Sequence, residues 1–202
     1  YHCERDVKAL KTIDIATGLY NRRGFTDKLE KWLSDNHNSV MLFYFAMEGY
    51  SNAARLIGPK QEEAFLKGIS GHMEEYIHSP FFAGYLGSGN FLLAVMDNMS
   101  ELQQMEFAKG MSLEMMLKVR INNEKNFLLP HYRCKKCQPG NGHADEEIET
   151  LIQAYYAKIM QESPVRMMRE KCEQLIEGKD DVVFDEYTDF EMTELSKTFN
   201  RY

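Results

Sequence analysis

The hydrophobic and polar positions form two distinct patterns along the first half of the chain. Phe25, Leu29 and Leu33 recur at the spacing of one helix face, which predicts an amphipathic helix over residues 22–33. Residues 40–47, VMLFYFAM, are apolar at nearly every position instead. An apolar run of this length is typical of a strand buried on both faces, so it predicts the centre of a sheet covered by helices.

The remaining pattern predicts a regular succession of helices and strands. Helices are expected at residues 51–57, 60–77, 100–118 and 146–161, and strands at residues 81–85, 90–96 and 127–133. The short glycine-containing linker at residues 86–89 joins two apolar runs, which is a hairpin signal. This order predicts an α/β fold with a mixed central sheet, helices on both faces and an antiparallel hairpin at the centre.

The two ends of the chain read as helical attachments. Residues 1–13 form a polar entering helix with Val7 and Leu10 on one side, which would permit pairing. Residues 14–161 form the domain, and residues 162–202 form a helical C-terminal extension or a linker to a next module. Because residue 1 is Tyr, we expect a piece of a longer protein.

Composition narrows the class of protein. The 202 residues contain 24 Lys and Arg and 31 Asp and Glu, which gives a net charge of −7. This balance argues against nucleic-acid binding and against direct contact with a membrane surface. The longest apolar run, residues 40–47, is too short to cross a bilayer. Four scattered cysteines favour a reduced, cytoplasmic location, either alone or as the cytoplasmic part of a larger membrane-linked protein.

A twelve-residue motif precedes the first long helix. Residues 14–25 read DIATGLYNRRGF, with the turn formers Gly18 and Asn21 inside it. The segment resembles the opening motif of GGDEF (diguanylate cyclase) domains, D-x-L-T-G-L-x-N-R-R-x-F, and departs from it only at Ala16. The resemblance implies a GGDEF-type fold. In that family, two domains each hold one GTP and join them into cyclic di-GMP, with carboxylates holding two divalent metals.

The positions that carry chemistry in the family differ here. The resemblance places Ala46 at the first metal-binding aspartate and Glu48 at the second acid. The hairpin G-G-D-E-F becomes residues 87–91, GSGNF, so Gly89 and Asn90 replace both acids. A divalent metal requires several hard oxygen ligands, mainly carboxylates, and these positions do not supply them. The resemblance therefore implies a degenerate domain that lacks metal-binding acids and has no catalytic residues.

The nucleotide pocket implied by the resemblance is weakened but keeps several members. Ser51, Ala54 and Glu162 each replace a favourable contact of the family. Glu63 stands where an acid grips guanine, and Lys158 stands where a lysine contacts phosphate. The expected vestigial pocket consists of Glu48, Tyr50, Glu63, Gly87, Ser88, Gly89, Asn90 and Lys158.

A separate cluster has ligand types that suit zinc. It consists of His131, Cys134, Cys137 and His143, and its C-x-x-C spacing fits tetrahedral coordination. The alternative is two cysteines at a strand end with the histidines in solvent. A zinc ion, if bound, would be structural because both histidines would close its coordination shell.

Three functions follow from the sequence, in order of preference. The first is a non-catalytic regulatory module of a multidomain bacterial signal-transduction protein, which acts through other domains of the same protein or through a homodimer. It requires no cofactor. The second is a GTP-binding sensor domain in cyclic di-GMP signalling, which would use Mg²⁺ with GTP. The third, an active diguanylate cyclase, needs metal ligands that the sequence lacks.

Overall fold

The computed structural model describes residues 11–35, 39–121, 124–140, 143–161, 171–174 and 176. The chain divides into two compact units, Tyr1–Ile152 and Gln153–Tyr202. The helices are α2 (Arg22–Asp35), α3 (Tyr50–Ile57), α4 (Pro59–Tyr76), α5 (Glu101–Glu114) and α6 (Ala144–Gln161). The strands are β1 (Val40–Ala46), β2 (Phe81–Gly87), β3 (Asn90–Val95), β4 (Leu117–Ile121), β5 (Glu124–Leu128) and β6 (His131–Cys137).

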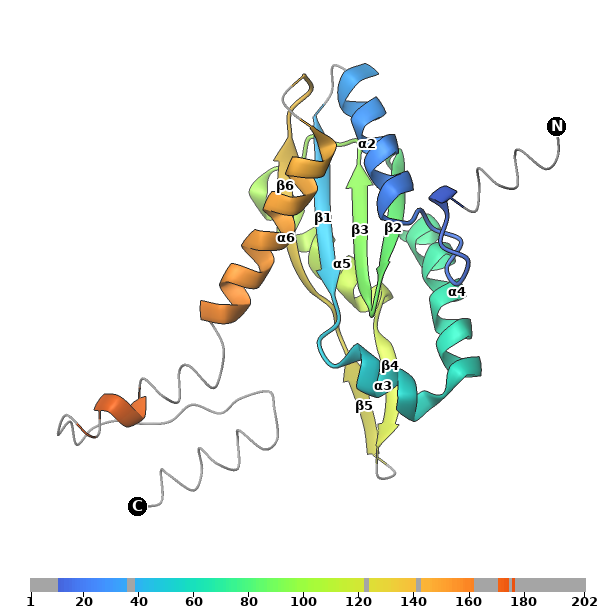
Figure 1. Ribbon diagram of the computed structural model, residues 1–202, viewed down its shortest axis with the longest axis vertical. Helices are drawn as coiled ribbons and strands as arrows, with labels where there is room; N and C mark the ends of the chain where they lie inside the picture. The colour runs from blue at the N-terminus through green and yellow to red at the C-terminus, as the bar shows by residue number, and fades with distance from the viewer. Residues whose placement is uncertain are drawn as a thin grey trace. The chain divides into compact units, whose positions relative to one another are not determined.

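Four strands form the central sheet of the first unit, in the order β2-β3-β1-β6 (Figure 1). Every neighbouring pair in it is antiparallel, with Phe43 of β1 opposite Leu93 of β3 on one side and Cys134 of β6 on the other. The parallel component of the expected mixed sheet is an isolated bridge between Tyr20 and Gly84. The α/β fold with flanking helices is confirmed, although the hairpin places β2 at an edge and only β3 inside.

The continuous apolar run of β1 is buried on both faces, as predicted. All seven of its residues are buried because alternate side chains enter two different layers. Met41, Phe43 and Phe45 belong to the hydrophobic cluster that includes residues of α4 and α5. The ring of Phe43 lies 5.0 Å from that of Phe107 on α5. On the opposite face, α2 packs on β2, and α2 and α6 lie in front of the sheet in Figure 1.

The elements after α5 differ from the prediction. The helix expected to reach residue 118 ends at Glu114, and β4 pairs with β5 in a separate two-stranded sheet. Leu117 and Val119 are buried whereas Lys118 and Arg120 are exposed, which is the period of a strand. The strand expected at residues 127–133 is two strands, because the chain breaks at residues 129–130 before β6. A proline at position 130 offers no N–H for pairing.

The twelve-residue motif, residues 14–25, forms the turn before α2 and the first part of that helix. Asp14 accepts hydrogen bonds at Oδ1 from the backbone N–H of Thr17 (2.9 Å) and from its hydroxyl (2.8 Å). Asn21 accepts at Oδ1 from the N–H of Gly24 (3.0 Å) in the first turn of α2. Arg22 pairs with two acids on α6, Asp145 and Glu149, at 2.7 and 2.8 Å. The residues that carry the family resemblance therefore hold the start of the domain against the sheet and α6.

The predicted attachments are described only in part. The entering helix expected at residues 1–13 lies outside the described residues except at its end, where residues 11 and 12 are helical. Most of residues 162–202, including the second amphipathic stripe, also lie outside them. No helix in the described ranges is both long and apolar enough to cross a membrane.

Candidate functional site

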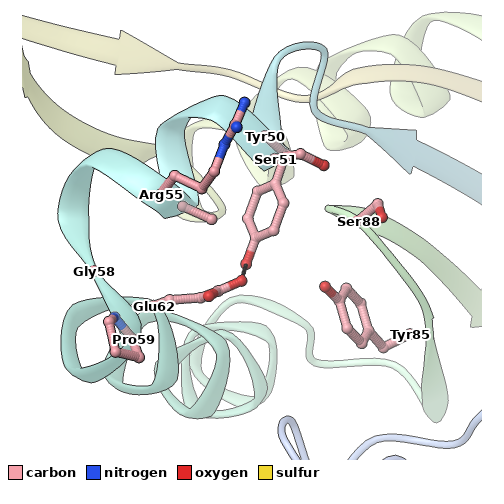
Figure 2. A pocket seen from close by; sticks show the side chains of 9 residues that line it. Tyr50, Ser51, Arg55, Gly58, Pro59, Glu62, Tyr85 and Ser88 are labelled. Atoms are coloured by element: carbon pink, nitrogen blue, oxygen red, sulfur yellow. Dashed lines mark hydrogen bonds between the residues drawn. The ribbon is translucent and has the colours of Figure 1, made fainter.

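A surface pocket opens between α3, the start of α4 and the β2–β3 hairpin (Figure 2). Its volume is about 520 Å³. Nine residues line it: Tyr50, Ser51, Ala54, Arg55, Gly58, Pro59, Glu62, Tyr85 and Ser88. The helix break between α3 and α4 shapes the wall, because Gly58 adopts φ 79° and Pro59 starts the next helix without needing an N–H partner.

Tyr50 and Glu62 connect the two helices across the pocket. The Tyr50 hydroxyl donates a hydrogen bond to Oε1 of Glu62 at 3.0 Å, as Figure 2 shows. Burial, followed by the neighbouring Tyr85 and by Glu62, raises the pKa of Tyr50 well above its usual range. Burial likewise raises the pKa of Tyr85, whose hydroxyl accepts from the backbone N–H of Gly89 at 3.3 Å. Both phenols therefore stay protonated at neutral pH and serve as neutral hydrogen-bonding groups.

The ring of Tyr50 fills the space beside Gly89 in the hairpin turn. A Cβ atom added to Gly89 would lie 2.6 Å from Cγ and 2.7 Å from Cβ of Tyr50. Gly89 also adopts φ +75°, a conformation that L residues with side chains rarely take. No side chain fits at position 89 in this arrangement, and a carboxylate is therefore excluded there.

Asn90 is fully engaged in closing the same turn. Its Nδ2 donates to the carbonyl oxygens of Gly87 (2.9 Å) and Ser88 (3.3 Å). Its Oδ1 accepts from the hydroxyl of Tyr44 at 2.8 Å. In the register of the sheet, Asn90 stands opposite Ala46, which is buried and has no polar side chain. The side chain of Asn90 therefore serves the hairpin, and its single neutral oxygen already accepts from Tyr44.

We expect Asn90→Asp to destabilise the domain by about 1–3 kcal/mol. The substitution replaces a donor that serves two carbonyl oxygens with an acceptor, so three acceptors would face one another. Urea unfolding measures the change. Asn98→Asp is the matched control, because Asn98 is exposed and its Oδ1 accepts from Lys136. The control should stay within about 0.5 kcal/mol of the parent chain. Equal stability of the two variants would contradict the assigned role.

The structure brings together only part of the predicted vestigial pocket. Tyr50 and Ser88 line it, and Gly87, Gly89 and Asn90 belong to the hairpin beside it. Glu48 is exposed and is not among the lining residues.

Two charged residues of the predicted pocket, Glu63 and Lys158, are not among the residues that line it. The side chain of Glu63 is 59% exposed and pairs with Lys67 one turn along α4 at 2.5 Å. Its hydrogen bond with Lys67 lowers the pKa of Glu63. The acid that lines the pocket is its neighbour Glu62. Lys158 lies in the second compact unit, and its role stays a prediction.

Sequence reasoning missed Arg55, Pro59 and Tyr85 as pocket residues. Arg55 follows Ser51 by four positions on α3, so the two share a helix face, and this spacing was a usable signal. Arg55 donates from Nη2 to Oδ1 of Asn52 and gives the pocket a cation. With Arg55 and Glu62, the pocket presents one positive and one negative group to a ligand.

The four residues of the predicted zinc cluster do not converge. Cys134 and Cys137 are three positions apart on β6, so they point to opposite faces of the sheet. The Cys134 thiol contacts Gln104 on α5, whereas the Cys137 thiol contacts Glu147 on α6. Burial first, then Glu147, raises the pKa of Cys137 to about 12, so this thiol stays protonated. Across the described ranges, no three His, Cys, Asp or Glu side chains form a group that could hold a metal ion.

The antiparallel sheet, its helical layers and the pocket beside the hairpin define an α/β domain with a surface pocket at one end of the sheet. A family profile described as "Diguanylate cyclase, GGDEF domain" matches residues 11–154. The chain therefore belongs to the GGDEF domain family. No curated protein matches the sequence.

Solved structures agree with this fold. The coiled coil and GGDEF domain of DgcB from Caulobacter crescentus, in complex with c-di-GMP, is similar with a TM-score of 0.63 at 19% identity, covering 80% of this chain and 86% of that chain. A sensory box/GGDEF family protein from the same organism has a TM-score of 0.59 at 18% identity, covering 72% and 96%. The diguanylate cyclase SiaD from Pseudomonas aeruginosa, in complex with its activator SiaC, has a TM-score of 0.60 at 20% identity, covering 80% and 64%.

Proposed function

We propose that this chain is a non-catalytic regulatory GGDEF module in cyclic di-GMP signalling. The observation that carries the proposal is the lack of a carboxylate at three packed positions at and beside the β2–β3 hairpin. The family places carboxylates at the positions of Ala46, Gly89 and Asn90. Here Ala46 is buried, Gly89 lies against the Tyr50 ring, and Asn90 is engaged by the turn and Tyr44. A two-metal mechanism needs acids at these places to neutralise the developing charge.

The proposal is tested by incubating the whole chain with GTP and either Mg²⁺ or Mn²⁺. We expect no cyclic di-GMP, because the described residues contain no cluster of acids able to hold the metals. Formation of the product in a reaction that depends on protein and metal would contradict the proposal.

A module without turnover acts through contacts. Among the similar structures, SiaD is in complex with its activator SiaC, and the DgcB structure comprises a coiled coil and a GGDEF domain. We propose that this chain acts through other domains of its parent protein or through a second copy of itself.

A second candidate function is a nucleotide sensor, which the open pocket favours. The volume of about 520 Å³ is within the range of small-molecule sites. Glu62 keeps Oε2 for the donor edge of a base while its Oε1 accepts from Tyr50. The guanidinium of Arg55 suits a phosphate. This candidate predicts binding of GTP without conversion.

Calorimetric titration with GTP distinguishes the two candidates. The sensor predicts saturable heat that Glu62→Ala weakens at least about tenfold, the loss of one charge-assisted contact. Glu63→Ala is the matched control, because it removes the same charge from the neighbouring residue. The side chain of Glu63 lies outside the pocket and pairs with Lys67. It should leave binding unchanged. Absence of heat, or equal weakening by both variants, would reject the sensor and leave the contact-based function.

A further inference from the structure

Helix α5 carries an apolar stripe on the side that faces away from the core. Leu102, Met105 and Leu113 are exposed by 62%, 57% and 53%. They lie on one helix face together with Glu106 and Lys109, which are also exposed. A surface helix normally has a single apolar face, which it turns toward the core. The outer stripe of α5 is therefore a candidate contact surface.

The other face of α5 already supplies the core. Ala108 and Met111 are fully buried in the hydrophobic cluster, and Phe107 packs on Phe43. The helix start is secured by a capping box between Ser100 and Gln103. The fold of the domain thus leaves the outer stripe without a role. Three large apolar side chains along one helix face form a surface that is typical of protein contacts.

The sequence of the stripe is complementary to itself when two copies run antiparallel. Leu102 with Leu113, and Glu106 with Lys109, share one midpoint between residues 107 and 108. A twofold axis through that midpoint sets each Leu102 against the Leu113 of the second copy. It also sets each Glu106 against the opposite Lys109. A twofold interface requires this kind of self-complementarity.

Charge supports the same arrangement. Neither Glu106 nor Lys109 forms an ion pair with any other residue in the described part of the chain, although they are three positions apart. Antiparallel helices also place opposite dipole ends side by side. The seam from Leu102 to Leu113 spans roughly 16 Å at 1.5 Å per residue. In this twofold arrangement the two ends of the seam would be apolar and its centre would carry two reciprocal ion pairs.

We infer that the outer face of α5 pairs with α5 of a second copy of this chain, antiparallel, in the register that joins Leu102 to Leu113. The inference deepens the proposed function, since it names the partner through which a contact-based module acts. A single helix pair buries less surface than a standard interface, so the dimer dissociates on dilution.

Sedimentation velocity of the whole chain over a concentration series tests the inference with a charge-swap cycle. Glu106→Lys and Lys109→Glu each set like charges against each other and should weaken the dimer at least about fivefold. The double variant restores opposite charges and should recover most of the lost affinity. Lys31→Glu is the matched control, because Lys31 is an exposed residue of α2. It should dimerise like the parent chain.

A chain that is monomeric at all concentrations overturns the inference. A dimer that both single variants leave intact, or that the double variant fails to restore, overturns it as well. Thermal unfolding by circular dichroism verifies that the variants fold. Synthesis of cyclic di-GMP is measured separately, so failure of the proposed function and failure of the α5 pairing are distinguishable.

Discussion

Gly89→Asp is expected to lower the free energy of unfolding by about 2–5 kcal/mol. The new Cβ would lie 2.6 Å from the Tyr50 ring, and the backbone at φ +75° disfavours any side chain. In a chain of this size the melting temperature should fall by roughly 10 °C. The acid of the family hairpin is therefore excluded by packing, and restoring it should unfold the site before it restores metal binding.

Two further variants separate the steric cost from the backbone cost. Gly87→Asp is the matched control, because Gly87 adopts φ +88° but has no atom within 4 Å of an added Cβ. It should cost only the backbone penalty, about 1–2 kcal/mol. Combining Gly89→Asp with Tyr50→Ala should destabilise less than the sum of the two single changes. Strict additivity would contradict the assigned clash.

Gly24→Ala is the second substitution with a large expected effect. The added methyl group would lie 2.1 Å from the carbonyl oxygen of Thr12, and this oxygen already accepts from the N–H of Asn21 at 2.9 Å. Because the clash is with backbone, we expect a loss of about 2–4 kcal/mol in the free energy of unfolding. Urea unfolding provides the measurement.

Gly71→Ala is the matched control for this substitution. Gly71 lies inside α4 and has no atom within 4 Å of an added Cβ. Alanine there should raise stability by about 0.5–1 kcal/mol, because glycine is the poorer helix former. Opposite signs for the two glycine-to-alanine changes would support the motif as a packing device. Equal effects would show that the close approach at Thr12 does not constrain the fold.

The sequence patterns that predicted the fold each lie within one short stretch of neighbouring residues. The run at residues 40–47 identified β1 because a strand buried on both faces leaves no polar position. Strand β4 and its pairing with β5 were not predicted, because the Met-rich pattern of α5 continues past Glu114 without a break. Lys118 and Arg120, alternating with buried Leu117 and Val119, were the available signal.

The candidate site was harder to predict because it depends on helix phase and on distant contacts. Glu62 and Glu63 are adjacent in sequence, yet one residue rotates a side chain by about 100° around the helix. That rotation places Glu62 in the pocket and Glu63 beside Lys67. The contact of Tyr50 with Gly89 joins residues far apart in the chain, and no local pattern records it.

A turnover assay with GTP shows directly whether the chain performs cyclase chemistry. The whole chain is incubated with labelled GTP and Mn²⁺ or Mg²⁺ over a range of protein concentrations, because the family reaction joins two nucleotides held by two domains. We expect no cyclic di-GMP above a protein-free control at any protein concentration. Product that accumulates with time, rises with protein concentration and disappears on chelation of the metal would contradict it.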